Sequence, residues 1–136
     1  MRKWFEIEIV RYIISGMSAV FTDFVSYILL YELLNFNASI SKGASYILGA
    51  FLAFIINKLW TFETAKSHKT HVALIKFVIL YSFSFTLNIL INAVVLELTA
   101  FTLFAFAIAT GTSIVVNYLG QKFWVFRKNN QVNERG

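Results

Sequence analysis

Four long apolar segments follow one another along the chain, separated by short polar stretches. They lie near residues 12–34, 44–59, 77–98 and 103–123. Each approaches the ~20 residues that an α-helix needs to cross a hydrocarbon layer ~30 Å thick. The pattern therefore predicts an all-α membrane protein with four transmembrane helices.

The second and fourth segments share a face of small and polar residues at every fourth position. In the second segment this face is Ser41, Ser45, Gly49, Ala53 and Asn57, and 64 residues later it is Ala105, Ala109, Ser113, Asn117 and Gln121. Both segments end in a Lys-x-Trp-x-Phe motif, first at 58–62 and then at 122–126. Small residues at this spacing let two helix backbones approach closely.

The first and third segments also correspond, with Arg11 aligned to Lys76 and Asp23 to Asn88. The chain therefore reads as a duplication with halves 11–62 and 76–126. Each half holds two helices, so both halves insert in the same orientation, which is a parallel repeat about an axis along the membrane normal.

Composition and charge agree with a membrane protein and orient it. Of the 136 residues 58% are hydrophobic and only 14% are charged, against ~45–50% and ~25% in soluble proteins. Basic residues cluster before the first helix (Arg2, Lys3, Arg11), around the middle loop (Lys58, Lys66, Lys69, Lys76) and after the fourth helix (Lys122, Arg127, Lys128, Arg135). Lys42 alone lies on the other side. By the positive-inside rule both termini and the loop 63–71 are cytoplasmic, and this distribution accounts for the net charge of +5 without a nucleic-acid partner.

Little chain remains outside a transmembrane domain at 11–126. Residues 1–10 form either an interfacial amphipathic lead-in or a frayed tail anchored by Trp4, and 127–136 form a cytoplasmic tail. The loops hold no Gly-rich phosphate loop and no paired acidic motif, and the chain has no cysteine. His68 and His71 lack a third ligand for a metal. We expect no enzyme activity, no metal and no cofactor.

Two groups of polar residues are candidates for function. The first is a cytoplasmic ring of cations and aromatics: Arg11, Lys58, Lys76, Lys122, Trp60 and Trp124. Such cations suit a phosphate, although they could also serve only to set topology and attract anionic lipid. The second is a polar track inside the membrane: Asp23, Asn57, Asn88, Asn92, Asn117 and Gln121. A carboxylate near the middle of a transmembrane helix costs about 2.5–3.5 kcal/mol on insertion scales, so Asp23 has either a transport role or a hydrogen-bonding partner on another helix.

These motifs, together with the positions of Gly16 and Asp23, resemble the GtrA family of small four-helix bacterial membrane proteins. The resemblance covers nearly everything from 11 to 126. It implies flipping of polyprenyl-phosphate-linked sugars across the cytoplasmic membrane for envelope polysaccharide glycosylation. It also implies phosphate contacts from Lys58 and Lys122, with Asn57 and Asn117 beside them.

Two other functions stay open at the level of sequence. A small proton-coupled exporter would use Asp23 as its carboxylate, and a non-transporting protein would position a membrane glycosyltransferase. Four helices enclose little volume, so a homodimer is a further expectation. A flipping assay with a fluorescent polyprenyl-phosphate sugar separates these functions.

Overall fold

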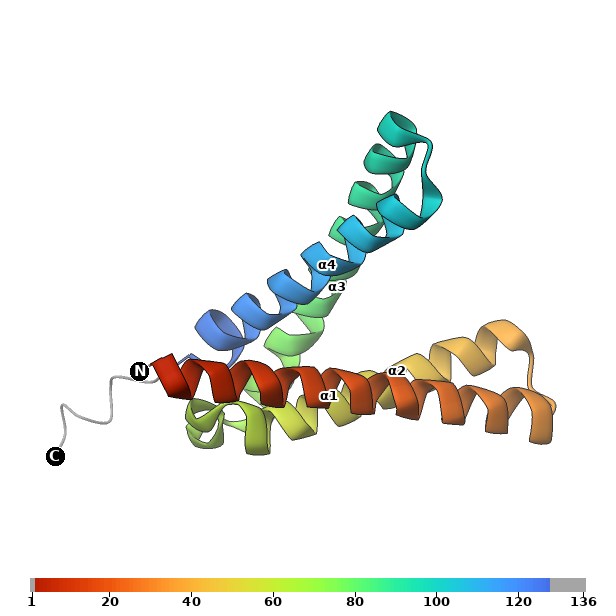
Figure 1. Ribbon diagram of the computed structural model, residues 1–136. Helices are drawn as coiled ribbons and strands as arrows, with labels where there is room; N and C mark the ends of the chain where they lie inside the picture. The colour runs from red at the N-terminus through yellow and green to blue at the C-terminus, as the bar shows by residue number, and fades with distance from the viewer. Residues whose placement is uncertain (1, 128–136) are drawn as a thin grey trace, which may run out of the picture. The chain divides into compact units, whose positions relative to one another are not determined.

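The computed structural model describes residues 2–127, and they fold into four long helices (Figure 1). These are α1 (Arg2–Ile28), α2 (Ala38–Ile56), α3 (Thr70–Thr99) and α4 (Thr102–Gly120). Short π-helices extend three of them, namely η1 (Leu29–Leu33), η2 (Asn57–Thr61) and η4 (Gln121–Val125), and a 3₁₀-helix, η3 (Glu63–Ser67), precedes α3. All four are long and apolar enough to cross a membrane, and residues 2–127 contain no strand. The predicted all-α fold with four transmembrane helices is confirmed.

The chain divides into two compact units, 1–66 and 67–136. In the first unit α1 packs along α2, and in the second α3 packs along α4, each as an antiparallel hairpin with a short connection (Figure 1). The division falls between the two halves expected from the repeated motifs.

The first helix begins earlier than the apolar pattern indicates. Residues 2–10 form the first turns of α1 rather than a separate segment. Neither proline nor glycine occurs before Gly16, so nothing in this stretch interrupts the helix. An exposed ion pair between Arg2 and Glu6, 3.5 Å long and one helical turn apart, supports it. Residues 128–136 of the expected tail lie outside the described residues.

The small-residue face of α2 is buried against α1. Ser41, Ser45, Gly49 and Ala53 are all buried, and a β-carbon added to Gly49 would lie 2.6 Å from the carbonyl oxygen of Ala19. The two backbones therefore approach so closely that only glycine fits between them. The predicted role of this face in close helix packing is confirmed.

Both second helices end in the same way. α2 and α4 each span 19 residues and continue into a five-residue π-helix. The turn closes when Phe62 N–H donates to the Asn57 carbonyl in the first unit, and when Phe126 N–H donates to the Gln121 carbonyl in the second. Asn57 and Gln121 are both buried where the wider turn begins. Local π-turns of this kind are frequent at functional sites.

Candidate functional site

In the first unit, a cation from α1 lies against the aromatic end of α2. Arg11 Nη1 donates to the carbonyl oxygen of Trp60 over 3.0 Å, and its guanidinium carbon lies 5.3 Å from the centroid of the Trp60 ring. Carbonyls in the last turn of a helix lack an intrahelical partner, so Arg11 satisfies one of them while making a cation–π contact. Next to it the rings of Tyr12 and Phe62 lie 6.4 Å apart. We call Arg11, Lys58 and Trp60 the basic end of this unit.

Lys58 is the most enclosed cation of the first basic end. Its residue is only 9% exposed, and its ammonium donates to the carbonyl oxygen of Ala65 in η3 over 3.4 Å. Beside it, Thr61 Oγ1 donates to Asn57 Oδ1 over 2.9 Å. The partner described for the Lys58 ammonium is therefore a neutral carbonyl. A buried ammonium with a neutral partner keeps the capacity to bind an anion.

The second unit has a basic end of its own, made by Lys76, Lys122 and Trp124. Lys76 Nζ lies 5.9 Å from the centroid of the Trp124 ring, which matches the contact between Arg11 and Trp60. Lys122 Nζ donates to the Tyr118 hydroxyl over 3.4 Å and lies 5.6 Å from the centroid of the Tyr118 ring. Each unit thus combines two cations with an aromatic ring at one end of its hairpin.

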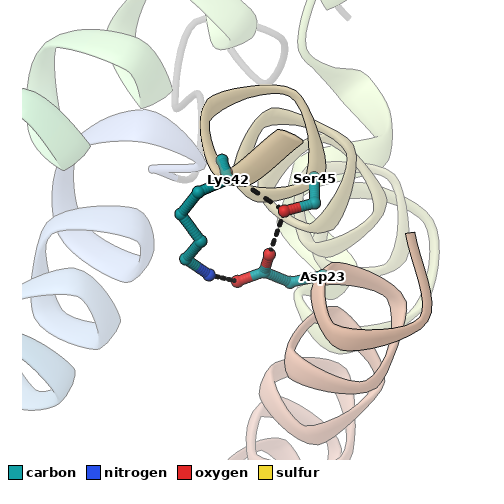
Figure 2. A network of polar contacts seen from close by, with 3 residues as sticks. All are labelled: Asp23, Lys42 and Ser45. Carbon is teal, nitrogen blue, oxygen red and sulfur yellow. Dashed lines mark hydrogen bonds and ion pairs between the residues drawn. The ribbon is translucent and has the colours of Figure 1, made fainter. Parts of the chain in front are cut away.

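Nearer the middle of the first unit, Asp23 of α1 is held by two side chains of α2 (Figure 2). Lys42 Nζ lies 2.6 Å from Asp23 Oδ2, and Ser45 Oγ donates to Asp23 Oδ1, also over 2.6 Å. Ser45 Oγ additionally lies 3.1 Å from the Lys42 carbonyl oxygen. The carboxylate is therefore neutralised within its own hairpin, which offsets the cost of placing it in the membrane.

The corresponding part of the second unit is uncharged. Asn88 Nδ2 donates to Ser113 Oγ over 3.0 Å, and Ser113 Oγ in turn donates to the Ala109 carbonyl over 3.0 Å. Asn92 is half-buried one turn beyond Asn88. Asn117 Oδ1 is buried and has no hydrogen-bond partner among residues 2–127. Within their own units, Asp23 thus contacts side chains of α2 and Asn88 contacts a side chain of α4.

Comparison with known proteins identifies the family. Residues 11–131 match the transmembrane domain of GtrA/DPMS proteins, which is most of the 136-residue chain. The chain belongs to the GtrA/DPMS family. This GtrA/DPMS chain is also 27% identical over 124 residues to an uncharacterized membrane protein, YwcD, of Bacillus subtilis (strain 168), covering 88% of this chain and 97% of YwcD. The resemblance to the GtrA family is confirmed, and with it a membrane protein of a family linked to glycosylation.

One polar residue of this GtrA/DPMS domain escaped the sequence reasoning. In the sequence Lys42 stands out only as the exception to the charge bias, yet it is the partner of Asp23. The two signals that could have paired them are a lone cation on the sparsely charged side and a lone carboxylate in the adjoining helix. Among residues 2–127 no group of three histidine, cysteine or carboxylate side chains that could hold a metal ion is found. His68 Nε2 instead contacts the Arg127 carbonyl.

Proposed function

We propose that this chain translocates polyprenyl-phosphate-linked sugars across the cytoplasmic membrane of a bacterium, for glycosylation of envelope polysaccharides. The observation that carries the proposal is Lys58, a buried ammonium whose described partner is the neutral Ala65 carbonyl. It lies at the end of a membrane-spanning helix, beside a tryptophan that is 40% exposed. The phosphate of a monoester or diester would supply the negatively charged partner that is not described for this ammonium.

The charge distribution supports the orientation that this function requires. The cations of both basic ends belong to the strongly basic side of the chain, which the positive-inside rule places in the cytoplasm. There the phosphate of a lipid-linked sugar lies at the level of the helix ends, and both termini are cytoplasmic too. The exposed rings of Trp60 and Trp124 suit the sugar or the first isoprenoid units, because indole prefers the interface.

Proton-coupled export is the weaker alternative for this geometry. Such an exporter would need Asp23 to exchange protons, whereas Asp23 already has a cationic partner and a hydroxyl donor. A non-transporting partner of a membrane glycosyltransferase would carry cations at the same helix ends, so it is separated from a flippase by experiment. Assembly as a homodimer remains a prediction.

The test is flipping of a fluorescent polyprenyl-phosphate sugar by purified protein in liposomes. Lys58→Ala and Lys122→Ala should each slow flipping by about tenfold or more, because a hydrogen bond to a charged group contributes about 1.5–3 kcal/mol. Lys66→Ala is the matched control, since it removes the same charge from an exposed position and should leave flipping unchanged.

Insertion is checked in the same samples with single cysteines, since the chain has none. In intact cells Ser39→Cys should react with an impermeant label and Ser67→Cys should be protected. Normal flipping by the Lys58→Ala, Lys122→Ala double variant would refute the basic ends as the phosphate site. If the parent protein does not flip the lipid but exports a dye, the exporter is favoured. If it does neither, the glycosyltransferase partner is favoured.

A further inference from the structure

The side chain of Lys42 extends toward the middle of its helix. Its partner Asp23 has its β-carbon 3.2 Å from where a β-carbon on Gly49 would be, so Asp23 lies beside a residue seven positions further along α2. Seven residues correspond to about 10 Å of helix. A lysine near the end of a transmembrane helix normally extends outward to reach the membrane surface. Lys42 instead places its ammonium on Asp23, next to Ser45, within the helix Ala38–Thr61 that is apolar enough to cross a membrane.

The Lys42 ammonium also keeps donors in reserve. An ammonium has three N–H groups, and the one partner described for it is Asp23 Oδ2. The Lys42 side chain is 60% exposed while that of Asp23 is 19% exposed. Lys42 Nζ and Ser45 Oγ each donate a hydrogen bond to a different oxygen of the Asp23 carboxylate (Figure 2). The same pair of donors would grip two oxygens of a phosphate.

Helix packing does not require this ion pair. The second unit has the neutral pair Asn88 and Ser113 in the corresponding region, and its helices pack along each other without a charge there. An ion pair inside a protein is often no more stabilising than apolar side chains of the same volume. The charges of Asp23 and Lys42 therefore need an explanation beyond holding α1 against α2.

We propose that Lys42 and Ser45 form a second binding site for the lipid phosphate, further across the membrane than the basic end of the same unit, and that Asp23 occupies it between transport events. The site rests on the proposed function, which supplies an anionic headgroup that must cross this region. During translocation the phosphate replaces the Asp23 carboxylate on Lys42 and Ser45. When the lipid leaves, Asp23 returns, so no unpaired ammonium is left in the membrane.

The experiment measures binding at this site apart from the basic ends. Full-length protein carrying Lys58→Ala and Lys122→Ala is placed in nanodiscs of neutral phosphatidylcholine, with an environment-sensitive fluorophore on Ser39→Cys. Ser39 is exposed and three residues from Lys42. The probe is geranyl phosphate, and the two reference compounds are geraniol and inorganic phosphate. Saturable binding of geranyl phosphate that geraniol does not reproduce supports the proposal, and equal binding of inorganic phosphate would overturn the assignment to a lipid headgroup.

Substitutions then test the competition with Asp23. Asp23→Asn keeps the shape of the side chain but removes the resident anion, so it should tighten geranyl phosphate binding by at least about threefold, because Lys42 is then available all the time. Lys42→Gln combined with Asp23→Asn removes both charges without leaving a carboxylate unpaired, and it should abolish binding. Lys42→Arg should retain it.

Unchanged affinity in Asp23→Asn, or full binding by the double variant, would overturn the proposal. These outcomes do not depend on the basic ends, because the protein used in the binding assay carries Lys58→Ala and Lys122→Ala and the fluorophore is on residue 39. A failure of the proposed function would appear instead as absence of flipping by the parent protein.

Discussion

The two helix pairs share a plan but differ in how their helices meet. In the first pair, Gly49 brings the α2 backbone against the Ala19 carbonyl of α1, and a charged pair, Asp23 with Lys42, lies beside this contact. In the second pair a side chain, Leu80, fills the space next to Gly120, and the polar contact is the neutral one between Asn88 and Ser113. Ser113 takes the place of Gly49 in the second pair, 64 residues later, and its Oγ donates to the Ser84 carbonyl over 3.5 Å. The helices thus approach closely at this point in both units, and what sets the first unit apart is the charged pair beside the contact.

The basic ends differ in a related way. Lys58 is buried and donates to the carbonyl of Ala65, a residue of η3. Lys122 is half-buried and donates to the Tyr118 hydroxyl. Tyr118 stands 64 residues after Phe54, so the phenol is present in one copy of the motif and absent from the other. Two lysines that look equivalent in the repeat therefore have different partners, and we expect a phosphate to reach Lys122 more readily than Lys58.

The largest expected effect is on the free energy of unfolding when Gly49 or Gly120 is replaced by alanine. Gly49→Ala places a methyl group 2.6 Å from a backbone oxygen, so α1 and α2 must move apart, and we expect a loss of about 2–3 kcal/mol in the free energy of unfolding. Gly120→Ala meets the end of the flexible Leu80 side chain instead and should cost less than about 1 kcal/mol.

Gly111→Ala is the control for helix propensity. Nothing lies within 4 Å of the added carbon, so this change should be neutral or stabilise by about 0.5–1 kcal/mol. Unfolding in mixed SDS micelles measures all three variants. Equal losses for Gly49→Ala and Gly120→Ala would contradict the contrast between backbone and side-chain packing.

Sequence reasoning predicted what depends on a single helix. Ser45, Gly49 and Ala53 are small residues spaced four apart, and that spacing alone defines a helix face that a second helix backbone can approach. The lengths of the four helices follow from the apolar runs in the same way.

What sequence reasoning missed depends on two helices or on local geometry. The contact between Asp23 and Lys42 requires the register of the α1–α2 hairpin, which the connection at 34–37 sets and which no periodicity reveals. The π-turns after Ile56 and Gly120 shift the backbone within a single turn, so the apolar pattern scarcely changes. The presence of Tyr118 in place of Phe54 is visible in the alignment of the two copies, but its meaning requires the position of Lys122 Nζ.

A smaller effect should separate the two basic ends. Tyr118→Phe removes the hydroxyl that accepts from Lys122, and a hydrogen bond of this kind contributes about 0.5–1.5 kcal/mol. We therefore expect the rate of flipping, or the affinity for geranyl phosphate, to fall about two- to tenfold. Tryptophan fluorescence measures the affinity. The phenyl ring keeps its packing, so the stability should change little.

Tyr27→Phe is the control, because Tyr27 stacks on Tyr31 at the opposite end of the first hairpin. It loses a phenol without approaching either basic end, so binding should be unaffected. If Tyr118→Phe behaves like Tyr27→Phe, the hydroxyl does not position Lys122. The difference between Lys58 and Lys122 would then rest on burial alone.

The smallest effect concerns the connections that close the two hairpins. Each contains a residue with a left-handed backbone, Asn35 with φ 55° and Ala100 with φ 54°. Asparagine adopts this conformation readily, whereas alanine pays about 1–2 kcal/mol for it. In the second unit Ala100 N–H donates to the Leu96 carbonyl over 2.8 Å, the C-terminal helix cap in which glycine or asparagine is preferred. Ala100→Gly or Ala100→Asn should therefore raise the free energy of unfolding by about 0.5–1 kcal/mol, and Asn35→Ala should lower it by a similar amount. If Ala100→Gly instead lowers the free energy of unfolding, the left-handed conformation of Ala100 does not cost stability in this connection.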